Sequence, residues 1–109
     1  MATASYKVLG QSNPAATTVT TLYTTPSATS AVCSTLAITN LGVSTTFRVA
    51  IRPAGATLAN QHYIAYDTPI NQYDTVFLTI GVTLATTDMI SVYAGTATIA
   101  FSLFGSEIA

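Results

Sequence analysis

Most residues that could take part in chemistry fall in one stretch of this chain, from Phe47 to Ile70. The stretch holds both arginines, the only histidine and one of the four acidic residues. Arg48 and Arg52 are four positions apart in an alternating apolar and polar segment, so a strand would place both on one face, about 13 Å apart. Arginine offers a planar fork for bidentate pairing. We expect the two arginines either to be solvated or paired with acids inside the subunit, or to anchor a contact between subunits.

His62, next to Tyr63, is the one histidine that could serve as a general base. A catalytic triad would also need an acid that orients the imidazole and an activated nucleophile, and the chain carries no G-x-S-x-G motif. We therefore predict that the protein is not an enzyme. His62 is expected in a strand, near a sheet edge or a contact surface.

Candidate metal ligands are few and scattered. One histidine and one cysteine, about thirty positions apart, do not supply the converging ligands of a zinc site. Asp67 and Asp74 flank one predicted turn with two amide side chains between them, which makes a weak Ca²⁺ site conceivable. The alternative is that Asp67 caps an Asx turn and Asp74 begins a strand. We predict no metal site and no cofactor.

Three of the six tyrosines lie close to Asp67 in the sequence. Exposed tyrosines could stack on a sugar ring, as in carbohydrate-binding β-sandwiches. They also suit a protein interface, where an amphipathic ring gives a large contact area at little entropic cost, and we favour this interpretation. The predicted interface residues are Arg48, Arg52, His62, Tyr63, Tyr66 and Tyr73.

The low charge of the chain favours an assembly subunit. Only 6% of the residues are charged and the net charge is −1, whereas an ordinary globular domain has about 25% charged residues. Neutral faces rich in threonine, alanine and serine can be buried between subunits without leaving charges desolvated. We expect an obligate oligomer or a component of a larger assembly, with a low-charge monomer as the alternative. Three basic residues do not form a patch for nucleic acid, so no nucleic-acid partner is predicted.

No targeting or membrane segment is evident in the sequence. The first ten residues, MATASYKVLG, lack the apolar core of a secretory signal, and no apolar run approaches the roughly 18 residues of a membrane span. Cys33 has no second cysteine to pair with, and its place in an alternating segment predicts a small buried hydrophobe. We expect synthesis in a reducing cytoplasm and no membrane partner.

Alternating apolar residues and regularly spaced turn residues predict about eight short strands. The pattern indicates an all-β fold, a single β-sandwich domain over residues 1–109. Eight antiparallel strands suit a jelly roll, and an immunoglobulin-like arrangement is the alternative. The expected strands are residues 6–9, 17–24, 30–39, 47–52, 62–66, 74–80, 89–94 and 96–104.

Turn residues predict how several of these strands connect. Residues 40–42, Asn-Leu-Gly, predict a hairpin into the strand that begins at Phe47, and Gly95 predicts a tight hairpin between the last two strands. Pro53 should weaken strand pairing because it has no N–H to donate. Residues 81–88 are expected to form a crossover outside the strands.

Several stretches of the chain carry a resemblance to a known family. They are YKVLGQ, LYTTP, AVCSTLAITN, FRVAIRPAGATL, HYIAYDTPI, DTVFLTIGVTL and FSLFGSEI, which together extend over residues 6–108. They resemble small virion structural proteins of tailed bacteriophages, cyanophages in particular. The matching stretches are strand and turn signatures without catalytic residues.

The resemblance implies a β-sandwich that assembles in many copies on a virus particle in the cytoplasm of the host bacterium. Some proteins of this kind are capsid decoration or cement subunits, which stabilise the head by bridging capsomers. Others lie in the neck, tail, baseplate or fibres, where a small receptor- or glycan-binding module is the alternative function. The implied partners are the major capsid protein or other virion proteins, with a homo-oligomer such as a trimer.

Overall fold

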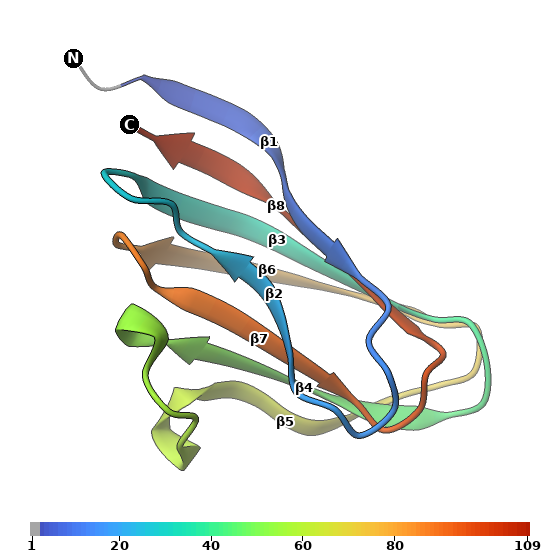
Figure 1. Cartoon of the computed structure of the whole chain (residues 1–109). Coiled ribbons are helices and arrows are strands. Elements are labelled where there is room, and N and C mark those ends of the chain that lie inside the picture. The colour runs from blue at the N-terminus through green and yellow to red at the C-terminus, as the bar shows by residue number, and fades with distance from the viewer. Residues whose placement is uncertain (1–2) are drawn as a thin grey trace.

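The computed structural model describes residues 3–109 as two four-stranded antiparallel sheets packed face to face (Figure 1). The strands are β1 (Ala4–Ser12), β2 (Thr20–Thr24), β3 (Ser30–Asn40), β4 (Thr45–Arg52), β5 (Tyr63–Ile70), β6 (Thr75–Leu84), β7 (Met89–Ala94) and β8 (Ile99–Ile108). Two short 3₁₀ turns, η1 (Pro53–Gly55) and η2 (Asn60–His62), connect β4 to β5. The predicted all-β sandwich of about eight strands is confirmed. In this range no helix has the length and apolarity needed to span a membrane.

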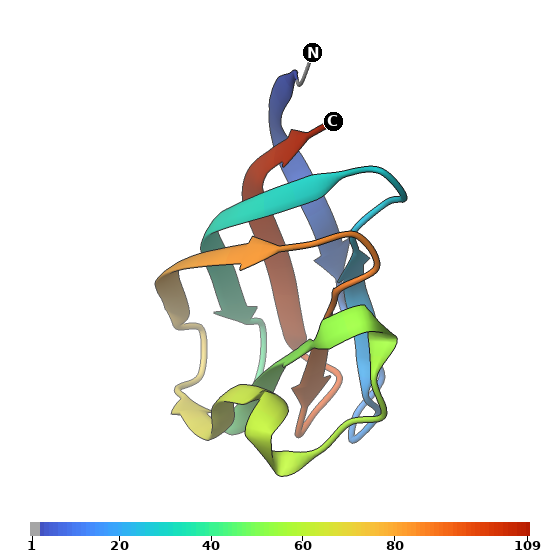
Figure 2. The ribbon, with the colours of Figure 1, turned by 90° about the vertical axis from the view of Figure 1, so that its left-hand side faces the viewer.

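The strand order is that of a jelly roll. One sheet has the order β1-β8-β3-β6 and the other β2-β7-β4-β5. β1 pairs with β8, β2 with β7, β3 with β6 and β4 with β5, as in an antiparallel ribbon folded over on itself. An immunoglobulin-like sandwich pairs its first two strands in one sheet, whereas β1 and β2 lie in different sheets here. The first and last strands therefore lie side by side, and the start of β1 and the end of β8 meet at one end of the sandwich (Figure 2).

The core lies between the two sheets and consists of alternate residues from each strand. Ile99, Phe101 and Leu103 of β8 point inward and are at most 1% exposed, as the alternation predicts. Phe47 of β4 meets Phe101 edge to face across the core, with ring centroids 6.4 Å apart. Full burial of a large apolar side chain contributes about 1.5–3 kcal/mol, so these rows hold the sheets together.

A β-bulge in β3 moves its buried face by one residue. Pairing with both neighbouring strands shifts between Cys33 and Thr35, so Cys33 and Leu36 both face the core and are fully buried. Gly105 of β8 packs against this bulge, and a Cβ at that position would lie only 2.1 Å from the carbonyl oxygen of Val32. The prediction that Cys33 is a small buried hydrophobe is confirmed. Burial raises the pKa of its thiol to about 11.

Both predicted hairpins are wrong. β3 and β4 lie in different sheets, as do β7 and β8, so the connecting segments cross from one sheet to the other. The buried Asn40 holds these crossings together: its amide donates to the Val43 and Asn71 carbonyls at 2.7 and 3.2 Å, and its Oδ1 accepts from the Thr98 hydroxyl at 3.0 Å. Asparagine and glycine signal a change of direction, but they do not specify whether the next strand pairs with the previous one.

Several predicted boundaries also differ from the structure. β6 continues to Leu84 through part of the expected crossover, because Gly81 adopts a φ of 55° opposite the bulge in β3. Asp67 lies inside β5 rather than in a turn, with a φ of 47°. β1 and β8 are longer than expected, and β2 is shorter and begins at Thr20. As predicted, pairing in β4 ends immediately before Pro53.

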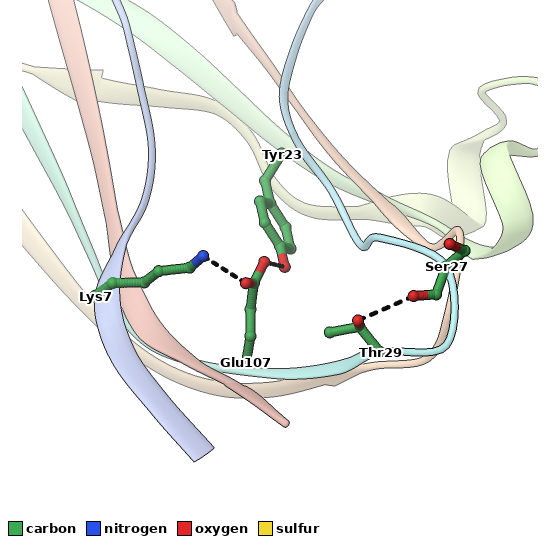
Figure 3. A network of polar contacts seen from close by, with 5 residues as sticks. All are labelled: Lys7, Tyr23, Ser27, Thr29 and Glu107. Atoms are coloured by element: carbon green, nitrogen blue, oxygen red, sulfur yellow. Dashed lines mark hydrogen bonds and ion pairs between the residues drawn. The ribbon is translucent and has the colours of Figure 1, made fainter. Parts of the chain in front are cut away.

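A polar network links the two sheets near the start of β1 and the end of β8 (Figure 3). The Tyr23 hydroxyl of β2 donates to Glu107 Oε2 of β8 at 2.5 Å, and Lys7 Nζ of β1 lies 2.5 Å from Glu107 Oε1. Only 15% of the Glu107 side chain is exposed. Its contacts with Lys7 and then Tyr23 hold the pKa of the Glu107 carboxyl below its usual range. Burial and the adjacent carboxylate raise the pKa of Tyr23 well above its ordinary value.

Candidate functional site

Arg48 is the centre of a cluster on the outer face of the β2-β7-β4-β5 sheet. Its Nε donates to Asp67 Oδ1 at 2.6 Å and its Nη2 donates to Oδ2 at 3.3 Å. The guanidinium carbon lies 4.1 Å from the ring centroid of Tyr66 and 4.3 Å from that of Tyr93. Both distances are within the range of cation–π contacts. We call Arg48, Tyr63, Tyr66, Asp67 and Tyr93 the Arg48 cluster.

Strand register brings the members of the cluster together. Arg48 lies directly opposite Tyr93 in the ladder between β4 and β7, so both side chains point to the same face. β5 approaches from the other side, and its pairing with β4 shifts on either side of Val49. The positive φ of Asp67 accompanies this irregular pairing, and aspartate is one of the residues that adopt this conformation most readily.

The charges in the cluster compensate each other. The bidentate contact with Arg48 holds the pKa of the Asp67 carboxyl below its usual range and raises the pKa of the Arg48 guanidinium. The Arg48 side chain is 22% exposed and that of Asp67 is 46% exposed. Of the two roles predicted for Arg48, pairing inside the subunit is the one seen in this structure. The resulting surface presents aromatic rings around a neutral ion pair.

Arg52 and His62 fasten the segment between β4 and β5. Arg52 Nε donates to the Ala56 carbonyl at 2.7 Å, and its Nη1 lies 3.3 Å from the Ser91 hydroxyl. The backbone N–H of Ala59 donates to His62 Nδ1 at 3.0 Å, and His62 ends η2 rather than lying inside a strand. Arg52 and His62 therefore each hold a backbone group of this segment. They lie close to the Arg48 cluster in sequence but are not part of it.

Tyr63 and Tyr66 line a shallow hollow next to Arg48. Their rings meet edge to face with centroids 4.8 Å apart, and Tyr66 is 56% exposed. Asn60 completes the lining of this hollow, which has a volume of about 350 Å³. Two aromatic rings and an amide give an uncharged recess with both stacking and hydrogen-bonding groups.

Tyr73 does not join the cluster. It lies in the turn between β5 and β6, has a φ of 60° and is 76% exposed. No aromatic or cation contact involving Tyr73 is found within residues 3–109. The structure thus gathers Arg48, Tyr63 and Tyr66, keeps Arg52 and His62 nearby in structural roles, and separates Tyr73.

The two carboxylates considered above as conceivable calcium ligands have different partners. Asp67 is held by Arg48, while Asp74 Oδ1 accepts a hydrogen bond from the Thr75 N–H at 2.9 Å, at the start of β6. The described part of the chain contains no group of three or more His, Cys, Asp and Glu side chains that could hold a metal ion.

Sequence reasoning missed a second surface, on the outer face of the β1-β8-β3-β6 sheet. Tyr6, Val8, Phe77 and Phe104 are exposed there by 87%, 49%, 68% and 37%. Val8 lies directly opposite Phe104 in the ladder between β1 and β8. A hollow of about 590 Å³ lies over β1, β8 and β3. It is lined by Tyr6, Lys7, Val8, Val32, Ser34, Phe104, Gly105 and Ser106. The alternation of Tyr6 and Val8 around Lys7 was the available signal. We call Tyr6, Val8, Phe77 and Phe104 the apolar face.

No family model, curated protein or solved structure matches this chain. The resemblance to phage virion proteins therefore stays a prediction, and the surfaces described above carry the functional argument.

Proposed function

We propose that this protein is a non-enzymatic structural subunit of a bacteriophage particle, and that it decorates or cements the capsid by bridging neighbouring capsomers. The observation that carries the proposal is the combination of two exposed aromatic surfaces with a small number of charged side chains, each of which has a partner inside the subunit. The Arg48 cluster lies on one sheet and the apolar face on the other. A subunit with a contact surface on each sheet is suited to bridging two neighbours.

All three basic and all four acidic side chains of the chain have partners inside it. Lys7 pairs with Glu107 and Arg48 with Asp67. Asp88 accepts hydrogen bonds from the backbone N–H groups of Ala54 and Ala85. The remaining two charged side chains, Arg52 and Asp74, also hold local contacts. Because the chain has only seven charged side chains and four of them form ion pairs, docking on a neighbour would desolvate mainly apolar and hydroxyl groups, which favours a lasting contact.

A cement subunit acts by mass action. A protein that binds the assembled shell better than its separated parts stabilises the shell, and the stabilisation grows with the ratio of its free concentration to its dissociation constant. Particles that lack this protein should therefore break at a lower temperature or under milder osmotic stress than complete particles. Equal resistance with and without the protein would exclude the cement role.

The first test is the copy number per particle, measured by quantitative mass spectrometry of purified phage against the major capsid protein. A copy number close to that of the major capsid protein supports a position on the head shell. A far smaller number would move the protein to the neck, tail, baseplate or fibres. Absence from particles would overturn the virion assignment.

The hollow beside Arg48 favours one second candidate, a small glycan- or receptor-binding module on a tail or fibre. Tyr63 and Tyr66 offer ring surfaces and Asn60 offers an amide, which together suit a neutral sugar. A glycan array tests this candidate, with Tyr63→Ala and Tyr66→Ala expected to lose binding. Tyr73→Ala is the matched control because it removes an exposed tyrosine outside the hollow. A blank array argues against the candidate.

A further inference from the structure

The first half of β1 is an open sheet edge. Among residues 3–109, β1 pairs only with β8, and no strand of this range lies on its other side in Figure 1. Residues 4–8 are exposed at every position, on both faces of the strand. Beyond them, Gly10 packs closely on the Leu22 backbone, where an added Cβ would lie 2.3 Å from the carbonyl oxygen. The register with β8 also shifts between Val8 and Gly10, so Ala4–Val8 is the regular part of this open edge.

Hydrogen bonds at the chain ends show which backbone groups face outward. Thr3 and Ala109 exchange two backbone hydrogen bonds, at 2.7 and 3.1 Å. The register continues from this pair without a shift as far as Val8. Because the direction of N–H and C=O groups alternates along a strand, residues 3, 5 and 7 face β8. The backbone groups of Ala4, Tyr6 and Val8 point to the open edge.

This edge lacks the usual protection against strand pairing. Proteins block open edges with proline, bulges or outward charges, especially lysine. Residues 4–8 contain no proline, and their only charge belongs to Lys7. The Lys7 ammonium is turned onto Glu107 of the same chain, at 2.5 Å (Figure 3). The one residue that could repel a neighbouring strand is therefore already neutralised.

We propose that two copies of this chain pair antiparallel along Ala4–Val8, with Tyr6 opposite Tyr6 and Ala4 opposite Val8 of the second copy. This register joins the outward groups of residues 4, 6 and 8 in three hydrogen-bonded pairs and is symmetric about a two-fold axis. It places Lys7 opposite Ser5, so no like charges meet. The two β1-β8-β3-β6 sheets become one continuous sheet, and the two apolar faces lie side by side.

The small contact area predicts a weak dimer. Tyr6 is 87% exposed, and an aromatic side chain buries about 150–250 Å² at most. Five strand residues and one such ring from each copy fall short of the ~800 Å² per partner of a standard interface. We therefore expect the dimer at high protein concentration, as on a crowded particle surface, and mostly monomer in dilute solution.

Paired cysteines test the register. In the proposed dimer, Cα atoms of positions 4 and 8 in different copies are about 5.5 Å apart, within the ~4.4–6.8 Å that a disulfide needs. The double variant Ala4→Cys/Val8→Cys should form a covalent dimer on mild oxidation. Ala4→Cys and Val8→Cys alone should not, because like positions are about 13 Å apart. The natural Cys33 is fully buried and does not compete.

Tyr6→Pro provides an independent test. Proline at position 6 removes an outward N–H and leaves the bonds to β8 intact, so the variant should fold but not dimerise. Tyr73→Pro is unsuitable because of its positive φ, so Tyr73→Ser serves as the control for loss of an exposed tyrosine. Sedimentation velocity up to about 1 mM should show wild-type and Tyr73→Ser dimers and a Tyr6→Pro monomer, in the concentration range that corresponds to weak association.

A wild-type monomer throughout this range, or equal cross-linking of the single and double cysteine variants, would overturn the inference. Either result leaves the proposed virion role unaffected, because that role depends on the copy number in particles. Conversely, absence from particles would not change the behaviour of the purified protein.

Discussion

Replacing Glu107 with glutamine keeps the shape of the side chain and removes the charge that Lys7 and Tyr23 contact. At pH 7 the hydrogen bond from Tyr23 changes from charge-assisted to neutral. Hydrogen bonds to charged groups contribute about 1.5–3 kcal/mol and neutral ones about 0.5–1.5 kcal/mol. The Lys7 side chain is 49% exposed, so its ion pair adds little. We expect Glu107→Gln to lower the free energy of unfolding by about 1–2 kcal/mol.

The effect should depend on pH. The pKa of Glu107 is lower in the folded protein than in the unfolded chain. Its carboxylate therefore contributes stability that is present above the unfolded value of about 4.3 and is lost as the pH falls through the folded pKa. Below that pKa the protonated glutamate resembles glutamine, so the difference between wild type and variant should approach zero. Asp67 also has a lowered pKa, but it is present in both proteins and cancels.

Urea unfolding at pH 7 and at about pH 3 measures this difference. Tyrosine fluorescence is a suitable signal because the chain has no tryptophan. Tyr23→Phe removes the donor of the same hydrogen bond and should show a loss of similar size at pH 7. An equal difference at both pH values, or none at pH 7, would refute the role assigned to the charge of Glu107.

Three further predictions concern other parts of the fold. Gly105→Ala should lower the free energy of unfolding by about 3 kcal/mol or more, because its Cβ would overlap the β3 backbone. At Gly81 the space around an added Cβ is open, but φ is 55°. Gly81→Ala should therefore lower the free energy of unfolding by only about 1 kcal/mol in the same urea experiment. Equal losses for the Gly105 and Gly81 variants would contradict the role of close packing at Gly105. Cys33, with its buried thiol and a pKa near 11, should not react with a thiol reagent at about pH 8 until the protein is unfolded; rapid labelling of the native protein would show that β3 opens locally. Arg52→Ala should speed proteolysis between β4 and β5, whereas Arg48→Ala should not, because only Arg52 holds the carbonyls of that segment; equal rates would count against this difference.

The alternation of residues predicted the strands and the core well. Ile99, Phe101 and Leu103 point inward because the side-chain period of a strand is independent of its partner. The pairing of strands was not predictable in the same way. Gly95 and the segment after Asn40 contain ordinary turn residues, but both connections cross between sheets, and only the packing of the whole sandwich decides this.

The candidate site was predictable in part. The stretch from Phe47 to Ile70 contributes most of the Arg48 cluster, because β4 and β5 are adjacent in both sequence and space. Tyr93 arrives from β7, and nothing near it in sequence indicates that it covers Arg48. The ion pair of Lys7 with Glu107 joins residues a hundred positions apart, so only the pairing of β1 with β8 reveals it.

The position of β8 has a consequence for how the chain folds during synthesis. β8 lies between β1 and β3 and is the only one of the described strands that pairs with β1. On a ribosome, which releases the N-terminal part first, β1 must wait unpaired until residues 99–108 emerge. Sheets that depend on such distant contacts close slowly. An incomplete chain that stops before β8 would leave both β1 and one edge of β3 unpaired, and would expose Phe47 and its core neighbours to aggregation.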